Sequence, residues 1–141
     1  MGVSTNKVLD VARALTDGET EEHWRSAASR GYYAAYYRAL RLADKYLPNG
    51  RVNIGMHARL IERIRAQGPD GSNVARLMWQ LKKTRTRADY HTSAPFSRRE
   101  ALRMVRSCSR VVRKLDDFEA RLATMPVCGE AVADSFYEPQ T

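Results

Sequence analysis

Residues 20–47, TEEHWRSAASRGYYAAYYRALRLADKYL, carry the strongest structural signal in the chain. Small and apolar residues recur there every three or four positions, which is the spacing of one face of an α-helix. Thr20 suits the N-cap, and Glu21 and Glu22 follow it in the first turn, where the helix dipole favours acids. Pro48 ends the pattern. The segment therefore predicts a long helix with a seam of small side chains that another helix can approach closely.

The same spacing recurs in four further segments, and no stretch alternates for long as a β-strand does. The expected helices cover residues 5–15, 54–66, 70–90 and 97–124. The run GPDG at residues 68–71 is expected to break the chain before the fourth helix, and Ser97 with Glu100 forms a capping box for the fifth. We therefore predict an all-α protein, an up-and-down four-helix bundle with a short additional N-terminal helix.

Length and composition set the domain organisation. A chain of 141 residues, 43% of them hydrophobic, is enough for one core and too small for two. We assign residues 1–124 to a single helical domain and residues 125–141 to an acidic C-terminal tail. No apolar run approaches the roughly 20 residues that cross a bilayer, and residues 1–15 are too polar for a signal peptide. We expect a cytoplasmic protein with no membrane partner.

The net charge of +8 is unevenly distributed. Residues 51–100 hold eleven cations and four acids, and residues 101–124 hold six cations and three acids. The last 17 residues hold three acids and no cation. A basic excess of this kind favours phosphate-rich partners, nucleic acid above all. A soluble, arginine-rich surface without a specific partner is the alternative.

The sequence lacks the signals of most enzyme classes. It holds no glycine-rich phosphate loop, no HExxH and no GxSxG. Cys108 and Cys128 do not form a CxxC pair, and the three histidines are scattered, so we expect neither a metal site nor a cofactor. Both cysteines are expected to be reduced thiols, with Cys108 on the apolar stripe of the last helix.

The end of the fourth expected helix carries the most suggestive chemistry. Residues 81–91, LKKTRTRADYH, place four cations before an Asp-Tyr-His triplet. An imidazole transfers protons near neutral pH, and a guanidinium stabilises the charge of a phosphate, which together meet the minimum for cutting RNA without a metal. Arg85 and His91 lie about 120° apart on a regular helix. They converge only if the helix ends or bulges near Asp89 and Tyr90; a histidine that caps the helix end is the alternative.

A second feature is the tyrosine-rich segment at residues 29–40, SRGYYAAYYRAL. Tyr32 and Tyr36, and likewise Tyr33 and Tyr37, are neighbours at helical spacing and form two aromatic columns. Tyrosines at this spacing usually lie in a core or an interface. Exposed rings also stack on RNA bases, so both interpretations stay open.

Three segments together resemble the HEPN superfamily. They are RSAASRGYYAAYYRAL at residues 25–40, NIGMH at residues 53–57 and RTRADYH at residues 85–91. The likeness is to small bacterial members with an S-R-x-Y-Y-A and an R-x-x-A-D-Y segment, and it covers residues 20–122. It implies a four-helix bundle that forms homodimers. It also implies, as in many members, a metal-independent endoribonuclease that acts as the toxin of a toxin–antitoxin or phage-defence system.

The resemblance assigns roles to individual residues. Active members carry an arginine, four to six further residues and then a histidine, which fits Arg85 and His91. By analogy Arg85 stabilises the scissile phosphate, His91 acts as acid or base, and two copies form one composite site that leaves a 2′,3′-cyclic phosphate. Supporting or RNA-binding roles are expected for Lys82, Lys83, Arg87, Asp89, Tyr90, His57 and Tyr33.

Two alternatives remain open. For His57, a hydrogen bond at a helix start or between helices is the preferred alternative. Other members of the superfamily bind nucleotides or serve as partner modules. The chain is therefore either an endoribonuclease or a noncatalytic module that binds RNA, a nucleotide or a partner protein such as a cognate antitoxin.

Overall fold

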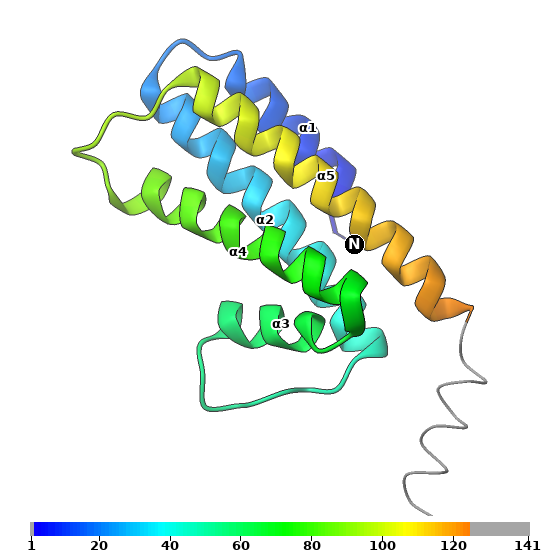
Figure 1. The fold of residues 1–141 in the computed structure, drawn as a ribbon. Coiled ribbons are helices and arrows are strands. Elements are labelled where there is room, and N and C mark those ends of the chain that lie inside the picture. The colour runs from blue at the N-terminus through cyan, green and yellow to red at the C-terminus, as the bar shows by residue number, and fades with distance from the viewer. Residues whose placement is uncertain (1, 125–141) are drawn as a thin grey trace, which may run out of the picture.

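The computed structural model describes residues 2–124, which form five helices and, within that range, no strand (Figure 1). The helices are α1 (Thr5–Thr16), α2 (Glu21–Tyr46), α3 (Met56–Arg65), α4 (Gly68–Tyr90) and α5 (Arg98–Ala123). The prediction of an all-α protein with a short N-terminal helix is confirmed. The acidic tail, Cys128 included, lies outside the described residues.

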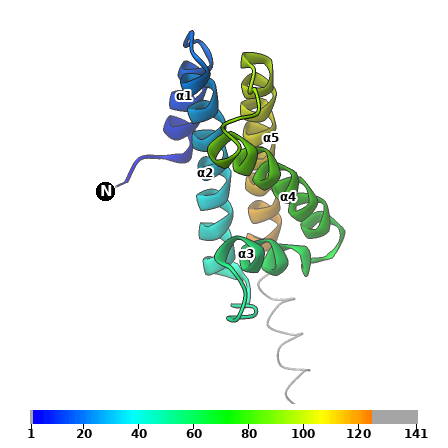
Figure 2. The same cartoon turned by 90° about the vertical axis from the view of Figure 1, so that its left-hand side faces the viewer.

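Helix α2 is the central element of the bundle. Helices α1, α4 and α5 pack along it, and the short α3 packs against α4 and the end of α2 (Figures 1 and 2). The chain reverses direction between α1 and α2, between α2 and α4, and between α4 and α5 (Figure 1). No helix among residues 2–124 is long and apolar enough to cross a membrane.

The seam of small residues on α2 lets α5 approach closely, as the sequence predicts. Ala28, Gly31 and Ala35 are buried there. A Cβ atom added to Gly31 would lie 3.2 Å from the Sγ atom of Cys108 on α5. Cys108 is fully buried, and this burial raises the pKa of its thiol. Larger side chains from the other helices complete the core.

The fourth helix begins two residues earlier than expected. Gly68 is its first residue rather than part of a separate loop, and Pro69 lies in its first turn. Gly68 has φ +76°, a conformation that glycine adopts readily, so the chain turns from α3 into α4 over very few residues. Pro69 is favourable in the first turn because its fixed φ suits a helix and an N–H there would have no helical acceptor.

The predicted helix starts at residues 20 and 97 are both found, but only one uses the expected cap. Ser97 Oγ accepts from the Glu100 N–H at 3.1 Å, and a Glu100 oxygen accepts from the Ser97 N–H at 2.8 Å. Thr20 occupies the N-cap of α2 but makes no side-chain capping bond. Its hydroxyl lies 2.6 Å from Nδ1 of His23 instead.

Candidate functional site

Helix α4 ends next to Asp89, at the position that the convergence of Arg85 and His91 needs. Tyr90 is its last residue, and His91 follows as C-cap with φ −100° and ψ 63°. The His91 N–H still donates to the carbonyl oxygen of Arg87 at 3.1 Å. Arg85 and His91 can approach each other only if the helix ends near Asp89, and this condition is met.

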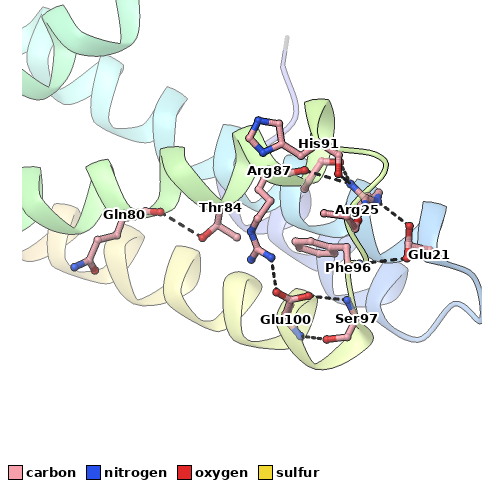
Figure 3. Close-up of polar contacts among 11 residues, drawn as sticks. Glu21, Arg25, Gln80, Thr84, Arg87, His91, Phe96, Ser97 and Glu100 are labelled. Carbon is pink, nitrogen blue, oxygen red and sulfur yellow. Dashed lines mark hydrogen bonds and ion pairs between the residues drawn. The ribbon is translucent and has the colours of Figure 1, made fainter.

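Arg25 of α2 forms hydrogen bonds with the backbone at the end of α4 and in the loop that follows it (Figure 3). Its Nη1 donates to the carbonyl oxygens of Arg87, Ala88 and His91 at 3.2, 2.8 and 3.3 Å, and its Nη2 donates to that of Ala94. The last carbonyls of a helix have no helical donors. Arg25 supplies such donors, and its charge is favourable at the negative end of the helix dipole.

The loop beyond α4 is also tied to α2 and α5 (Figure 3). Glu21 accepts from Nε of Arg25 at 3.1 Å and from the Phe96 N–H at 3.2 Å. Arg87 donates to Glu100 at 2.5 Å. The buried Phe96 ring lies between the two cations, with its centroid 5.5 Å from Cζ of Arg25 and 5.2 Å from Cζ of Arg87. The backbone on either side of His91 therefore has a defined position.

Arg85 points from α4 toward α2, where polar groups hold its guanidinium. Its Nη2 donates to the hydroxyl of Tyr33, and its Nε lies 3.0 Å from a carboxylate oxygen of Asp89. Ser29 donates to that same oxygen at 3.2 Å. The Nε–H is not directed at Asp89, so the contact is an ion pair, and Nε is a buried donor without an acceptor among residues 2–124.

Aromatic rings surround the same guanidinium. Cζ of Arg85 lies 5.6, 5.1 and 5.4 Å from the ring centroids of Tyr32, Tyr33 and Tyr90. These distances are typical of cation–π contacts. The side chain is only 11% exposed. Rings and carboxylate together fix a permanent positive charge at the boundary between α2 and α4.

His57 of α3 belongs to this cluster. Its Nδ1 lies 2.6 Å from the hydroxyl of Tyr32, and its ring centroid lies 4.6 Å from that of Tyr36. Burial, together with the positive charges of Arg85 and Lys82, lowers the pKa of His57. The expectation of a hydrogen bond between helices is confirmed for His57.

His91 lies on a different surface. Its exposed side chain lines an open groove of about 410 Å³ on the outer side of α4. Lys82, Lys83 and Arg87 line the same groove, together with Trp79 and two threonines. Arg85 does not line it. Within residues 2–124, no hydrogen bond, ion pair or ring contact joins His91 to Arg85.

The expected site residues thus fall into two groups. One group surrounds the guanidinium between α2, α3 and α4: Arg85, Asp89, Tyr90, Tyr33 and His57. The other lines the outer groove of α4: Lys82, Lys83, Arg87 and His91. Lys82 is also close enough to His57 to influence its pKa, so it links the two groups.

Three residues of the site were not predicted. Ser29 and Tyr32 lie within the S-R-x-Y-Y-A segment, which was the only signal for Ser29, whereas Tyr32 also belongs to an aromatic column that was left open between core and RNA contact. Arg25 precedes it, and its acceptors lie more than 60 positions along the chain. No local pattern identifies such a contact.

No group of three or more His, Cys, Asp or Glu side chains suited to a metal ion occurs in the part of the chain that the structure describes. Comparison of the chain with models of protein families, with curated proteins and with solved structures finds no match. The resemblance to the HEPN superfamily rests on the three sequence segments alone.

Proposed function

We propose that this chain is a metal-independent endoribonuclease in which Arg85 holds the scissile phosphate and His91 transfers a proton. The observation that carries the proposal is the fixed guanidinium of Arg85, held by Tyr33 and Asp89. Its Nη1 makes no hydrogen bond within residues 2–124 and is not among the buried unpartnered atoms there. One donor of a permanent cation is therefore left for a phosphate oxygen.

The proposed reaction is an internal transesterification. The 2′-hydroxyl of a nucleotide attacks the adjacent phosphorus and gives its proton to a base, so that a bond from O2′ to phosphorus forms. The bond from phosphorus to O5′ breaks, and O5′ takes a proton from an acid. The products are a 2′,3′-cyclic phosphate and a 5′-hydroxyl. The imidazole of His91 serves as the base and, once protonated, as the acid, and the guanidinium stabilises the charge that develops on the phosphate oxygens.

Because Arg85 and His91 lie on different surfaces of one chain, the proposal requires a second copy to complete the site. We propose a homodimer in which His91 of one copy meets the phosphate bound at Arg85 of the other. A twofold axis produces two such pairs without lengthening the chain. Helix α4 must then lie at or near the contact, because it carries Arg85 and leads into His91.

The proposed cellular role follows from the sequence resemblance. The enzyme would act in the cytoplasm as the toxin of a toxin–antitoxin or phage-defence system, restrained by a cognate antitoxin protein. A gene for such a protein beside this one would support the role. Growth arrest on expression of the natural chain, but not of the His91→Ala variant, is the expected result.

Two observations favour a noncatalytic module instead. His91 makes no side-chain contact that would orient its ring in the described part of the chain, and the charge of Arg85 is already balanced by Asp89. A module of this kind would bind RNA, a nucleotide or a partner protein without turnover. Binding of labelled RNA without cleavage distinguishes the two functions.

The deciding experiment is RNA cleavage in EDTA by the natural protein and by two single variants. We expect His91→Ala to abolish cleavage and His57→Ala to retain it. His91 caps α4 through its backbone, so replacing its side chain should leave the helical circular dichroism unchanged. Cleavage that survives in His91→Ala contradicts the role given to His91, and loss in His57→Ala alone transfers that role to His57.

A further inference from the structure

Helix α5 presents a row of arginines on its outer face, and none of them is among the groups that contact the guanidinium of Arg85. The row consists of Arg99, Arg103, Arg106, Arg110 and Arg113, and all five side chains are exposed. They recur every three or four residues, so at 100° per residue they fall within an arc of about 80°. We call this set the α5 arginine row.

The acidic side chains of α5 do not neutralise the positive charge of this row. None of its five members forms an ion pair within residues 2–124, whereas Asp116 and Glu119 both pair with Arg38 of α2. Glu100 pairs with Arg87 of α4. Asp117 is the one carboxyl on the line of the row, and it follows Arg113 by a single turn. Five positive charges therefore face solvent along one side of the helix.

The surface is hollowed on both sides of the row. Toward α1 lies a groove of about 640 Å³, lined by Arg106, Arg110 and Arg113 of the row and by Arg13. Its walls also include Asp17. Arg13 donates to Ser109 of α5 at 3.0 Å, which ties the two walls together.

A second groove, between α4 and α5, connects the row with the proposed cleavage site. Arg103 and Arg110 line it together with Arg87 and Glu100. Arg87 also lines the groove that holds His91. Figure 3 shows Arg87 between His91 and Glu100. Cations therefore continue from α5 to the end of α4.

The dimensions of the row fit a polynucleotide backbone. From Arg99 to Arg113 the helix rises about 21 Å. A nucleic-acid strand carries one phosphate for about each 3.4 Å of axis, so the row faces about six phosphates. Guanidinium groups fork onto phosphate oxygens. Regularly spaced phosphates are thus the ligand that matches the row in charge and in length.

A membrane surface fits less well. A helix that binds in a lipid interface places an apolar face among the acyl chains. The apolar face of α5 is already buried against the other helices, and no large hydrophobic side chain of Arg98–Ala123 is exposed. The row thus offers charge without an apolar anchor.

We propose that the α5 arginine row binds the phosphate backbone of RNA, at a site separate from the one where cleavage is proposed. The contacts are with phosphates, so the site holds RNA without reading its bases. This binding does not depend on catalysis, and it is expected whether or not the chain cuts RNA.

The test compares two triple variants with the same loss of charge. The row variant replaces Arg103, Arg106 and Arg110 by Gln. The control variant replaces Arg30, Arg65 and Arg76 by Gln, which are also exposed and form no ion pair among residues 2–124. Glutamine has a similar helix propensity to arginine, so both variants should keep the helical circular dichroism.

Binding is measured by fluorescence anisotropy with a labelled 20-nucleotide RNA whose 2′-hydroxyls are methylated, so that transesterification cannot occur. We expect the row variant to lose at least tenfold in affinity at 100 mM salt. The slope of log K against log salt should become shallower by about 2, because each lost phosphate contact of a single strand contributes about 0.7. The control variant should stay within twofold of the natural protein.

Three results would overturn the proposal. Equal losses in the two variants would mean that net charge, not the row, determines affinity. An unchanged row variant would place the RNA elsewhere. A row variant that loses affinity for phosphatidylserine vesicles but not for RNA would assign the row to membranes. The His91→Ala variant should bind the methylated RNA as the natural protein does, so failure of the proposed catalysis leaves this test intact.

Discussion

Replacing Arg25 by methionine should loosen the end of α4 and lower the stability of the whole bundle. Methionine preserves most of the apolar stem of the side chain but removes every donor. The carbonyl oxygens of Arg87, Ala88, His91 and Ala94 would then lose their partner on α2. Glu21 would lose its cation.

The magnitude follows from the burial of these groups. The bonds to Arg87 and Ala88 are partly buried. The Ala88 carbonyl left without a donor costs about 1 kcal/mol, and the Arg87 carbonyl costs less because it still accepts from the His91 N–H. The bonds to His91 and Ala94 are exposed, so water replaces Arg25 there at little cost. Glu21 is 41% exposed, so its ion pair adds less than about 1 kcal/mol after screening. The total is about 2 kcal/mol, which lowers Tm by about 8 °C in a domain of this size.

The assay is urea unfolding followed by circular dichroism, with Arg30→Met as the matched control. Arg30 is exposed on the same helix and forms no ion pair in the described part of the chain. The control should unfold within about 0.5 kcal/mol of the natural protein. Hydrogen exchange in the segment 91–94 should accelerate only in the Arg25 variant. Equal stability of the two variants would refute the role assigned to Arg25.

Three further predictions concern the core and the histidine of α3. Gly31→Val should cost about 1 to 3 kcal/mol in urea unfolding, because its side chain would crowd Cys108 on α5; a stabilised variant would show that the seam has spare room. In a Cys128→Ser background, Cys108 should stay unreactive toward a thiol reagent at pH 8 until the protein unfolds, because burial raises the pKa of its thiol; fast reaction in the folded state would contradict its burial. The free energy of unfolding should decline as pH falls below about 6.5, because the native pKa of His57 is lowered and the unfolded state binds the proton first. This decline should be weaker in His57→Gln, and an identical pH profile would assign it to other groups.

Local signals predicted the helices well. The capping box at Ser97 located the start of α5 because its two hydrogen bonds join residues three positions apart. The close packing at the seam of α2 was also predicted, since small residues at helical spacing allow another helix to approach. The predicted start of α4 was wrong because the sequence does not distinguish a glycine at a helix start, such as Gly68 with its positive φ, from an ordinary loop glycine.

The candidate site depended on contacts that no local pattern encodes. Helical geometry indicated that Arg85 and His91 point in different directions, and in the structure they lie on different surfaces. The sequence did not predict which side chains would contact Arg85 and which would lie beside His91. The contact of Tyr32 with His57 joins residues 25 positions apart, and that of Arg85 with Tyr33 joins residues 52 positions apart. Only the packing of α2 against α3 and α4 brings these pairs together.

Complementation between two inactive variants tests most directly whether Arg85 and His91 of different copies form one site. Each of the variants Arg85→Ala and His91→Ala is expected to be inactive alone in EDTA. After they are unfolded together and refolded as a mixture, a mixed dimer retains one intact pair, with Arg85 from one copy and His91 from the other. Since half of the dimers are mixed and each keeps one of two pairs, we expect about a quarter of the natural RNA cleavage. No recovery, with mixed dimers present by native mass spectrometry, would contradict it.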